Sequence, residues 1–282
     1  MTLKFIHLTD SHLVKPPQKL FGKDVAEHLR RAVDSINANH GDAAFCVVTG
    51  DITHWGEREA YDIAREALDA LAVPSHILIG NHDEREALCR AFPGLPTADG
   101  FVQYMLDTPA GHFLMLDTVA EGTPGGVLCP ARLQWLRTHL IAADAAGASV
   151  YIFMHHAPFP VGIRGMDDIR LENADDFWAA IDAGADVRYI FFGHLHRACH
   201  GIWRGVPFVS MGALSYQVGL VMDDTSPIHV CDDGPSYGVV TIAPSGVIIH
   251  HHHFLTEGTI RPYDRGIPAG SAAPPDHQKA WG

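Results

Sequence analysis

The sequence has few cysteines, no long apolar run and a deficit of positive charge. Its five cysteines are widely spaced among 282 residues and form no C-x-x-C pair, which argues against a disulfide framework and a zinc knuckle. No run of about 18 apolar residues occurs, so we expect no membrane span. With 20 Lys and Arg against 33 Asp and Glu, the net charge of −13 argues against nucleic acid as a partner.

Two further features bound the class of protein. The N-terminal stretch MTLKFIHLTDSH lacks the apolar segment of a signal peptide, and together with the scattered cysteines it predicts a reducing, cytoplasmic location. A composition of 47% hydrophobic and 19% charged residues allows a large core. Histidine is the one residue in clear excess, at 20, and this excess directs attention to metal binding.

Apolar runs and amphipathic segments alternate along the first 212 residues. The apolar, β-branched-rich runs predict strands at Leu3–Leu8, Ala44–Thr49, His76–Ile79, Phe113–Leu116, Val150–Met154, Tyr189–Phe192 and Phe208–Met211. The segments with helical periodicity are Asp24–Ala38, Glu57–Leu71, Asp83–Phe92, Pro130–Ala143 and Asn173–Ala183. This alternation predicts an α/β sandwich rather than an all-α or all-β fold.

The pattern changes after residue 212. Residues 213–235 have weak periodicity, two strand-like runs follow at Tyr237–Ala243 and Gly246–Leu255, and a Pro- and Gly-rich arm begins at Arg261. We therefore divide the chain into a catalytic core of residues 1–212 and a C-terminal β/cap extension of residues 213–282. Since unpaired edge strands tend to find partners, we expect this extension to support a homodimer or a larger homo-oligomer.

Polar side chains follow five of the predicted strands at the point where each strand ends. In chain order they are Asp10 and His12, then Asp51, then Asn81, His82 and Asp83, then His155 and His156, and finally His194 and His196. In an α/β sheet, ligands collect where the carboxyl ends of strands converge. We therefore expect these side chains to face one cleft.

Each fragment alone has a simpler explanation. The G-D at 50–51 is typical of a turn or a helix cap, and N-H-D at 81–83 would also suit the start of a helix. His155 and His156 would point to opposite faces of a continuing strand, and H-L-H at 194–196 would suit a surface turn. All five fragments in succession, each after an apolar strand, indicate a shared metal site.

The residue types restrict the kind of metal site. No cysteine is among the candidates, which disfavours a closed structural zinc site. Carboxylate, imidazole and amide ligands suit Mn, Fe, Zn or Co equally. About seven ligands from this set are too many for one ion and suit two divalent ions that share a carboxylate. Such a pair, about 3.5–4 Å apart, clamps the attacking and leaving oxygens of a phosphoryl transfer.

The series D-x-H, G-D, G-N-H-D, H and G-H-x-H resembles that of the calcineurin-like metallophosphoesterases. The resemblance covers residues 1 to about 215 and is closest to the bacterial class III cyclic nucleotide phosphodiesterases and their glycerophosphodiesterase relatives. It implies a four-layer αββα sandwich. It assigns one ion to Asp10, His12 and His196, the other to Asn81, His155 and His194, and makes Asp51 the bridge between them.

The resemblance also implies catalytic roles. His82 would reach the substrate phosphate, Asp83 would orient His82, and His156 would be either structural or a support for a metal ligand. His54 is either a substrate contact or a surface loop residue. The reaction would be in-line attack of a metal-bound hydroxide on a small phosphodiester. The stretches 19-KLFG-22 and 152-IFMHHAPFPVG-162 favour a glycerophosphodiester, with 3′,5′-cyclic AMP as the alternative.

Other functions are less consistent with the sequence. After Asp51 the chain reads I-T-H-W-G rather than the D-R of protein phosphatases, and G-N-H-D replaces their G-N-H-E, which weighs against a phosphoprotein substrate. A nuclease would require basic patches. A non-catalytic metal-binding scaffold would show eroded ligands and would lack His82, and neither is seen.

Overall fold

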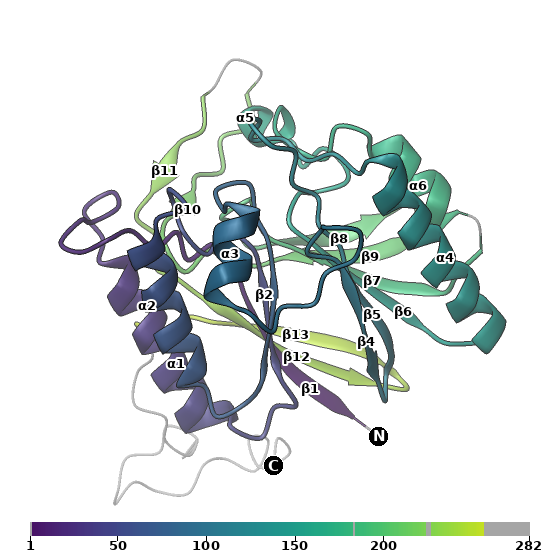
Figure 1. Ribbon diagram of the computed structural model, residues 1–282, viewed down its shortest axis with the longest axis horizontal. Coiled ribbons are helices and arrows are strands. Elements are labelled where there is room, and N and C mark those ends of the chain that lie inside the picture. Colours follow the sequence, from purple (N-terminus) through teal and green to yellow (C-terminus); the bar gives the residue numbers. More distant parts are fainter. Residues whose placement is uncertain (1, 183, 224–226, 257–282) are drawn as a thin grey trace, which may run out of the picture.

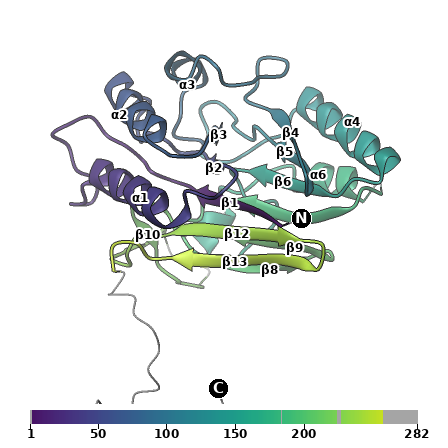
Figure 2. The same ribbon diagram turned by 90° about the horizontal axis from the view of Figure 1, so that it is seen from below.

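Two β-sheets pack face to face at the centre of the protein, with helices outside each of them (Figure 1). The computed structural model describes residues 2–182, 184–223 and 227–256. The predicted Pro- and Gly-rich arm from Arg261 lies outside these residues. Figure 2 shows the same layers from below. The four-layer αββα sandwich expected from the sequence is therefore confirmed.

The first sheet has the order β13-β12-β1-β2-β3. Strands β1, β2 and β3 run parallel, whereas β12 pairs antiparallel with β1 and β13 antiparallel with β12. Its strands are β1 (Leu3–Leu8), β2 (Cys46–Thr49), β3 (Ser75–Leu78), β12 (Tyr237–Ala243) and β13 (Gly246–His252). The last two strands of the described chain, β12 and β13, therefore belong to the same sheet as β1, and β13 is an edge strand of that sheet.

The second sheet has the order β4-β5-β6-β7-β9-β8, with β5, β6, β7 and β9 parallel. Its strands are β4 (Tyr104–Thr108), β5 (Gly111–Met115), β6 (Val150–Met154), β7 (Val187–Phe192), β8 (Cys199–Trp203) and β9 (Val206–Ser210). The antiparallel edge strands β4 and β8 were not predicted, because more of their side chains contact solvent and they lack a continuous buried run. A small ribbon pairs β10 (Gln217–Val218) with β11 (Val230–Cys231).

Among the described residues, five helices lie where amphipathic segments were predicted, and a sixth, short helix at Arg164–Asp167 was not predicted. Outside the first sheet are α1 (Val25–His40), α2 (Arg58–Asp69) and α3 (Arg85–Ala91); outside the second are α4 (Pro130–Ala146) and α6 (Ala174–Ile181), and a short α5 (Arg164–Asp167) lies near the top of Figure 1. Asp24 caps α1 as predicted, since its side chain accepts a hydrogen bond from the Glu27 amide. No helix among the described residues is long and apolar enough to cross a bilayer.

Aromatic side chains fill the space between the sheets. Phe5 lies with its ring edge-on to those of Phe113 and Phe191, at 5.4 and 5.6 Å between centroids, and all three are fully buried. Such pairs add about 0.5–1.5 kcal/mol each beyond the burial of their area. The two sheets are therefore held at a fixed separation, and the loops at their ends are fixed relative to each other.

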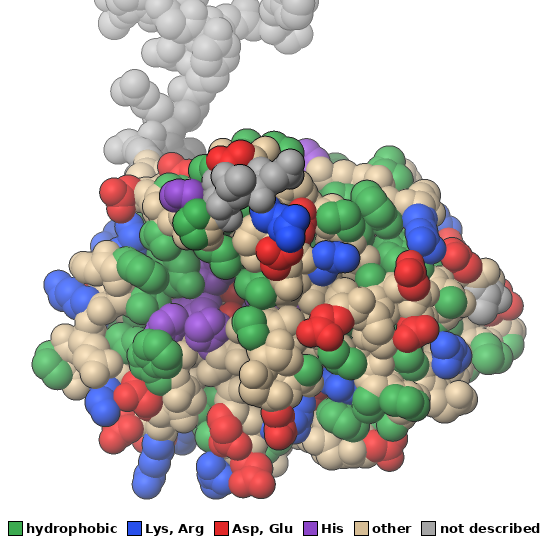
Figure 3. All heavy atoms as spheres, turned by 90° about the horizontal axis from the view of Figure 1, so that it is seen from above, with side chains coloured by type: hydrophobic (Ala, Val, Ile, Leu, Met, Phe, Trp, Pro, Cys, Tyr) green, Lys and Arg blue, Asp and Glu red, His purple; other side chains and the backbone are tan. Residues whose placement is uncertain are grey.

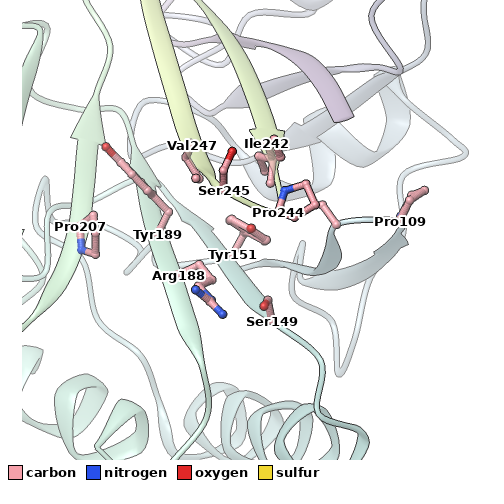
Figure 4. Close-up of a pocket in the computed structure, with 13 residues that line it drawn as sticks. Pro109, Ser149, Tyr151, Arg188, Tyr189, Pro207, Ile242, Pro244, Ser245 and Val247 are labelled. Carbon is pink, nitrogen blue, oxygen red and sulfur yellow. The ribbon is translucent and has the colours of Figure 1, made fainter. Parts of the chain in front are cut away.

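A cavity of about 490 Å³ lies between the amino-terminal ends of the parallel strands. Figure 4 shows Tyr151, Tyr189 and Arg188 lining it together with the β12–β13 turn. None of the predicted ligands lines it, because those residues follow the carboxyl ends of the same strands.

Candidate dinuclear metal centre

The five polar fragments meet at the carboxyl ends of β1, β2, β3, β6 and β7, as predicted. Figure 3 shows histidine side chains gathered in a hollow of this face, surrounded by hydrophobic side chains. Histidine and aspartate ligand atoms within 4.8 Å of one another form three groups among the described residues: a first with Asp10, His12, Asp51 and His196, a second with His155, His156 and His194, and a third with His12, His54 and His82. The sandwich thus brings together loops from both sheets.

In the first group, two imidazole nitrogens face each other. Nε2 of His12 lies 2.9 Å from Nε2 of His196 and 3.2 Å from Oδ2 of Asp51. Oδ1 of Asp10 lies 3.4 Å from the His196 Nε2. The other ring nitrogen of His196, Nδ1, donates to the carbonyl oxygen of Tyr216 at 2.8 Å. The His196 tautomer therefore carries a lone pair on Nε2, toward the centre of the group.

The second group is built in the same way. Nδ1 of His155 donates to the carbonyl oxygen of Thr49 at 2.7 Å, which makes Nε2 the nitrogen that a metal ion would bind in place of a proton. That Nε2 lies 3.1 Å from Oδ1 of Asn81 and 3.3 Å from Oδ2 of Asp51. His194 donates from Nε2 to the carbonyl oxygen of Ile169 at 3.1 Å, and its Nδ1 is the nitrogen left for a ligand role.

Asp51 lies between the first and second groups. Its Oδ2 is the atom that approaches both His12 and His155, at 3.2 and 3.3 Å, while its Oδ1 accepts the backbone amide of His82 at 2.9 Å. The amide holds the carboxylate so that one oxygen faces both groups. This is the position that a carboxylate shared by two ions requires.

These residues fit a pair of cations. Carboxylate oxygens and imidazole lone pairs converge at separations of about 3 Å, an arrangement that repels itself unless positive charge lies between the acceptors. A metal about 2.0–2.1 Å from each nitrogen would place two such ligands at this separation. The carbonyl partners of His155, His194 and His196 fix their tautomers as they do in known metal sites.

The backbone at these positions is strained. Eight non-glycine residues in the described chain have positive φ, and five of them are predicted ligands: Asp10, His12, Asp51, His194 and His196. Such angles are uncommon outside glycine and cluster at functional sites. This observation is independent of the side-chain distances, and it indicates that the loops are shaped to aim these particular side chains.

Burial controls the charge of the histidines. Burial lowers the pKa of His12 and of His196 to about 4. Burial and, to a smaller extent, the neighbouring His156 ring lower the pKa of His194 well below its usual value. These rings are therefore neutral near pH 7, as metal ligands must be. Burial also opposes charge on His155, but Asp51 and then Asp10 outweigh it and raise its pKa to about 9. A metal ion at this position would compete with a proton on His155.

His82 and His54 form the open side of the site. Their rings stack at 4.7 Å between centroids, and Nδ1 of His82 donates to the carbonyl oxygen of His54 at 3.0 Å, so Nε2 of His82 remains available. Nδ1 of His54 lies 2.9 Å from Nδ1 of His12. Both side chains are partly exposed, so a substrate in the hollow can reach them.

Asp83 does not take the position expected of it. We expected its carboxylate to orient His82, but within the described ranges no bond joins the two side chains. The carboxylate instead accepts the amides of Ile52, Thr53 and Gly80 at 3.0–3.1 Å, and the hydroxyl of Tyr61 at 3.1 Å. It therefore joins the loop after β2 to the loop after β3, and acts on the site through the backbone.

The buried His156 is occupied by protein partners. Its Nδ1 accepts from the Thr118 hydroxyl at 2.7 Å, and its Nε2 donates to the carbonyl oxygen of Pro124 at 3.1 Å. Both His155 and His156 are fully buried, so neither points to solvent as a simple surface strand would require. The structural role inferred for His156 is consistent with these contacts.

Sequence reasoning did not identify the aromatic side chains beside the hollow. The ring centroid of Tyr216 lies 4.2 Å from that of His196, and Phe21 lies edge-on to Tyr216 at 4.7 Å between centroids. On the other side Trp55 lies against His54 at 4.3 Å. Phe21 and Trp55 are 59% and 65% exposed, which is unusual for such large apolar groups. The loops that carry Phe21 and Trp55 have no periodic apolar pattern, so the sequence alone did not place these side chains beside the hollow.

Known proteins are similar to this chain in sequence. The family model described as "Calcineurin-like phosphoesterase" matches residues 3–198. A probable cyclic nucleotide phosphodiesterase of Rhodopseudomonas palustris is 41% identical over 92% of this chain and 95% of its own length. The glycerophosphodiester phosphodiesterase GpdQ of Enterobacter lignolyticus is 31% identical over 79% of this chain and 81% of its own.

Solved structures show the same fold. A dimetal phosphatase from Danio rerio superposes with a TM-score of 0.67 at 18% identity, over 89% of this chain and 96% of its own. Fold, ligand groups and family model together define a metal-dependent hydrolase of phosphoric esters. The chain belongs to the calcineurin-like phosphoesterase family.

Proposed function

We propose that this protein is a dinuclear-metal phosphodiesterase. Asp10, His12 and His196 hold one ion, Asn81, His155 and His194 hold the other, and Asp51 bridges them. The observation that carries this proposal is the placement of Asp51 Oδ2 within 3.3 Å of a histidine from each group. Two divalent ions would supply hydroxide near neutral pH and neutralise charge on the phosphate.

The chain itself supplies orientation and a proton. The ring of His82 lies edge-on to that of His12, at 4.6 Å between centroids. Because Nδ1 of His82 donates to the carbonyl oxygen of His54, Nε2 is the nitrogen left to face the hollow. We assign to this nitrogen a hydrogen bond to the substrate phosphate or to the leaving oxygen. His54 supports His82 from behind through its carbonyl and its stacked ring, and we propose that its exposed edge also contacts the substrate.

We infer that a 3′,5′-cyclic nucleotide is the preferred substrate. Phe21 with Tyr216 on one side of the hollow, and Trp55 on the other, offer flat apolar surfaces on which a base can stack. A glycerol diester has no comparable group. The relative with 41% identity is named a probable cyclic nucleotide phosphodiesterase. A glycerophosphodiester, which the sequence favoured, is the second candidate, because GpdQ is 31% identical and the 19-KLFG-22 similarity lies on that side.

The substrate prediction is tested by kcat/KM. With metal-replete enzyme, we expect the value for 3′,5′-cyclic AMP to exceed that for glycerophosphoethanolamine by about a hundredfold, or about 2.7 kcal/mol. Phe21→Ala should reduce kcat/KM for the cyclic nucleotide by about tenfold, in line with the value of one base–aromatic stack. It should leave the glycerol diester nearly unaffected. The reverse ratio would make the glycerophosphodiester the substrate.

The metals and the compartment are further proposals. The ligand set suits Mn, Fe, Zn or Co, and elemental analysis of purified protein would identify the pair. All five cysteines lie among the described residues, and each is a free thiol, which supports a reducing, cytoplasmic location. Cell fractionation would contradict this location if the protein were found outside the cytoplasm.

We also infer self-association through the edge strands. β13 and β8 end the two sheets, and they expose Ile248 and Ile202 at 59% and 72%. Exposed apolar edge strands favour pairing with another chain. Light scattering should give the mass of a dimer or larger oligomer for the wild type and that of a monomer for an Ile248→Lys, Ile202→Lys variant. A monomeric wild type would contradict the inference.

A further inference from the structure

A line of buried hydrogen bonds connects the core of the first sheet to the metal centre. Nε2 of His7 lies 2.8 Å from Oγ1 of Thr49, which lies 2.8 Å from Oγ1 of Thr9, which in turn lies 2.6 Å from Oδ2 of Asp10. All four side chains are fully buried. His7 is three residues before Asp10 and is not among the predicted site residues.

The number of hydrogens on these side chains determines which group donates in each hydrogen bond. The Thr9 hydroxyl donates to Oδ2 of Asp10, which carries no proton when the carboxylate holds a metal ion. The Thr49 hydroxyl must then donate to Thr9, and Nε2–H of His7 must donate to Thr49, because any other assignment leaves one contact without a hydrogen. His7 Nδ1 is then an acceptor, and it has no partner in the part of the chain that the structure describes.

Burial makes this form of His7 the stable one. It lowers the pKa of His7 to about 3, with His251 as a smaller cause, so the ring is neutral and carries one N–H. The ring lies edge-on to Phe153 and Phe191, at 6.2 and 5.9 Å between centroids. Since both aromatic rings are fully buried, the imidazole is packed in place with Nε2 directed at Thr49.

At the other end, the line of bonds determines which oxygen of Asp10 faces the metal centre. Oδ2 accepts from the Thr9 hydroxyl, and the backbone amide of His194 is shared by both carboxylate oxygens, at 3.0 Å from Oδ2 and 3.2 Å from Oδ1. Oδ1 is left toward Nε2 of His196, at 3.4 Å. A Cβ at Gly193 would collide with both Thr9 Oγ1 and Asp10 Oδ2, so this position accommodates the bond only as glycine.

Thr49 also touches the second ligand group. Its carbonyl oxygen accepts the Nδ1–H of His155, while its hydroxyl belongs to the line from His7 to Asp10. One residue at the end of β2 therefore orients a ligand in each group.

We propose that His7 is a positioning residue of the metal centre, which acts through Thr49 and Thr9 to hold the Asp10 carboxylate with Oδ1 toward the ion. This proposal rests on the dinuclear site described under Proposed function. His7 itself touches neither metal nor substrate. His7 donates the first hydrogen bond of the series, and each bond in such a series strengthens the next.

The test is the affinity of the metal-free protein for Mn²⁺, measured by titration calorimetry, with thermal unfolding of each apoprotein in parallel. Thr9→Val should weaken Mn²⁺ binding by about 10–100-fold, as loss of a partner bonded to a ligand typically does. Thr49→Val and His7→Phe should each weaken it by about tenfold, the lower end of that range. His7→Gln, whose amide can donate from a similar position, should restore affinity to within about twofold of the wild type.

Two controls separate positioning from packing. Phe5→Leu changes a buried residue on the same face of β1, and it should lower stability without changing Mn²⁺ affinity. The double variant His7→Phe, Thr9→Val should bind Mn²⁺ as Thr9→Val does, because His7 cannot act once the chain is broken nearer to Asp10; effects from packing would add instead.

Unchanged Mn²⁺ affinity in both His7→Phe and Thr49→Val would overturn the proposal, even if Thr9→Val binds weakly. Failure of the proposed function looks different: the wild type itself would then bind no Mn²⁺ pair or would not hydrolyse diesters.

Discussion

Asp51→Ala is expected to abolish diesterase activity and to empty at least one metal position. The variant loses the one carboxylate that faces both ligand groups, within 3.2 Å of His12 and 3.3 Å of His155. Because a correctly held metal supplies several kcal/mol of charge stabilisation, kcat/KM should fall by at least about a thousandfold. Elemental analysis should show fewer than two metal equivalents, where the wild type shows two.

Asp51→Ala should also affect the loop that carries His82. Asp51 Oδ1 accepts the amide of His82, so its removal frees the loop that carries the catalytic histidine. Asp51→Asn keeps an acceptor for that amide but removes the charge. It should therefore fold as well as the wild type and still lose metal. Retention of both metals and of full activity by either variant would refute the dinuclear assignment.

A matched control is Asp69→Ala. Asp69 is exposed at the last turn of α2, so its loss removes an aspartate without touching the site. Metal content and kcat/KM should remain at wild-type values. If Asp69→Ala also lost activity, the effect of Asp51→Ala would not be specific to the metal centre.

The sequence predicted the elements that are buried on both sides and the ligands that follow them. The parallel strands β1, β2, β6 and β7 are mostly apolar runs because helices and the opposite sheet cover them, and such runs are easily recognised. The polar residues after them were predicted as one site because strand ends in a sheet converge. Edge strands β4 and β8 were missed, since exposed faces remove the apolar signal.

The supporting contacts were not predictable because they join residues that are distant in sequence. His7, Thr9 and Thr49 look like ordinary strand residues, and only the pairing of β1 with β2 places their side chains in one line. Asp83 was expected to orient its neighbour His82, yet its carboxylate is oriented by the amides of the loop after β2. Sequence motifs thus identified the residue types, whereas the sheet register determines which atoms they present.

His82→Ala is expected to lower kcat by about 10²–10⁴-fold while leaving two metals bound, because it removes general-acid or charge-stabilising catalysis but no ligand. In the structure, Nδ1 of His82 is committed to the carbonyl of His54, and its ring is stacked on that of His54. Nε2 is therefore the atom that meets the substrate. Steady-state kinetics and elemental analysis on the same preparation would separate this role from metal binding.

The leaving group distinguishes the two roles open to His82. If it protonates the leaving oxygen, the loss of kcat should be large for an alkyl or ribose leaving group and small for an activated aryl diester, whose oxygen needs no proton. If it only stabilises charge on the phosphate, both substrates should lose kcat equally. His139→Ala, on α4 and bonded to the carbonyl oxygen of Trp135, is the matched control and should keep wild-type kcat on both substrates. Loss of metal from His82→Ala would instead make His82 a ligand, and unchanged kcat on both substrates would remove it from catalysis.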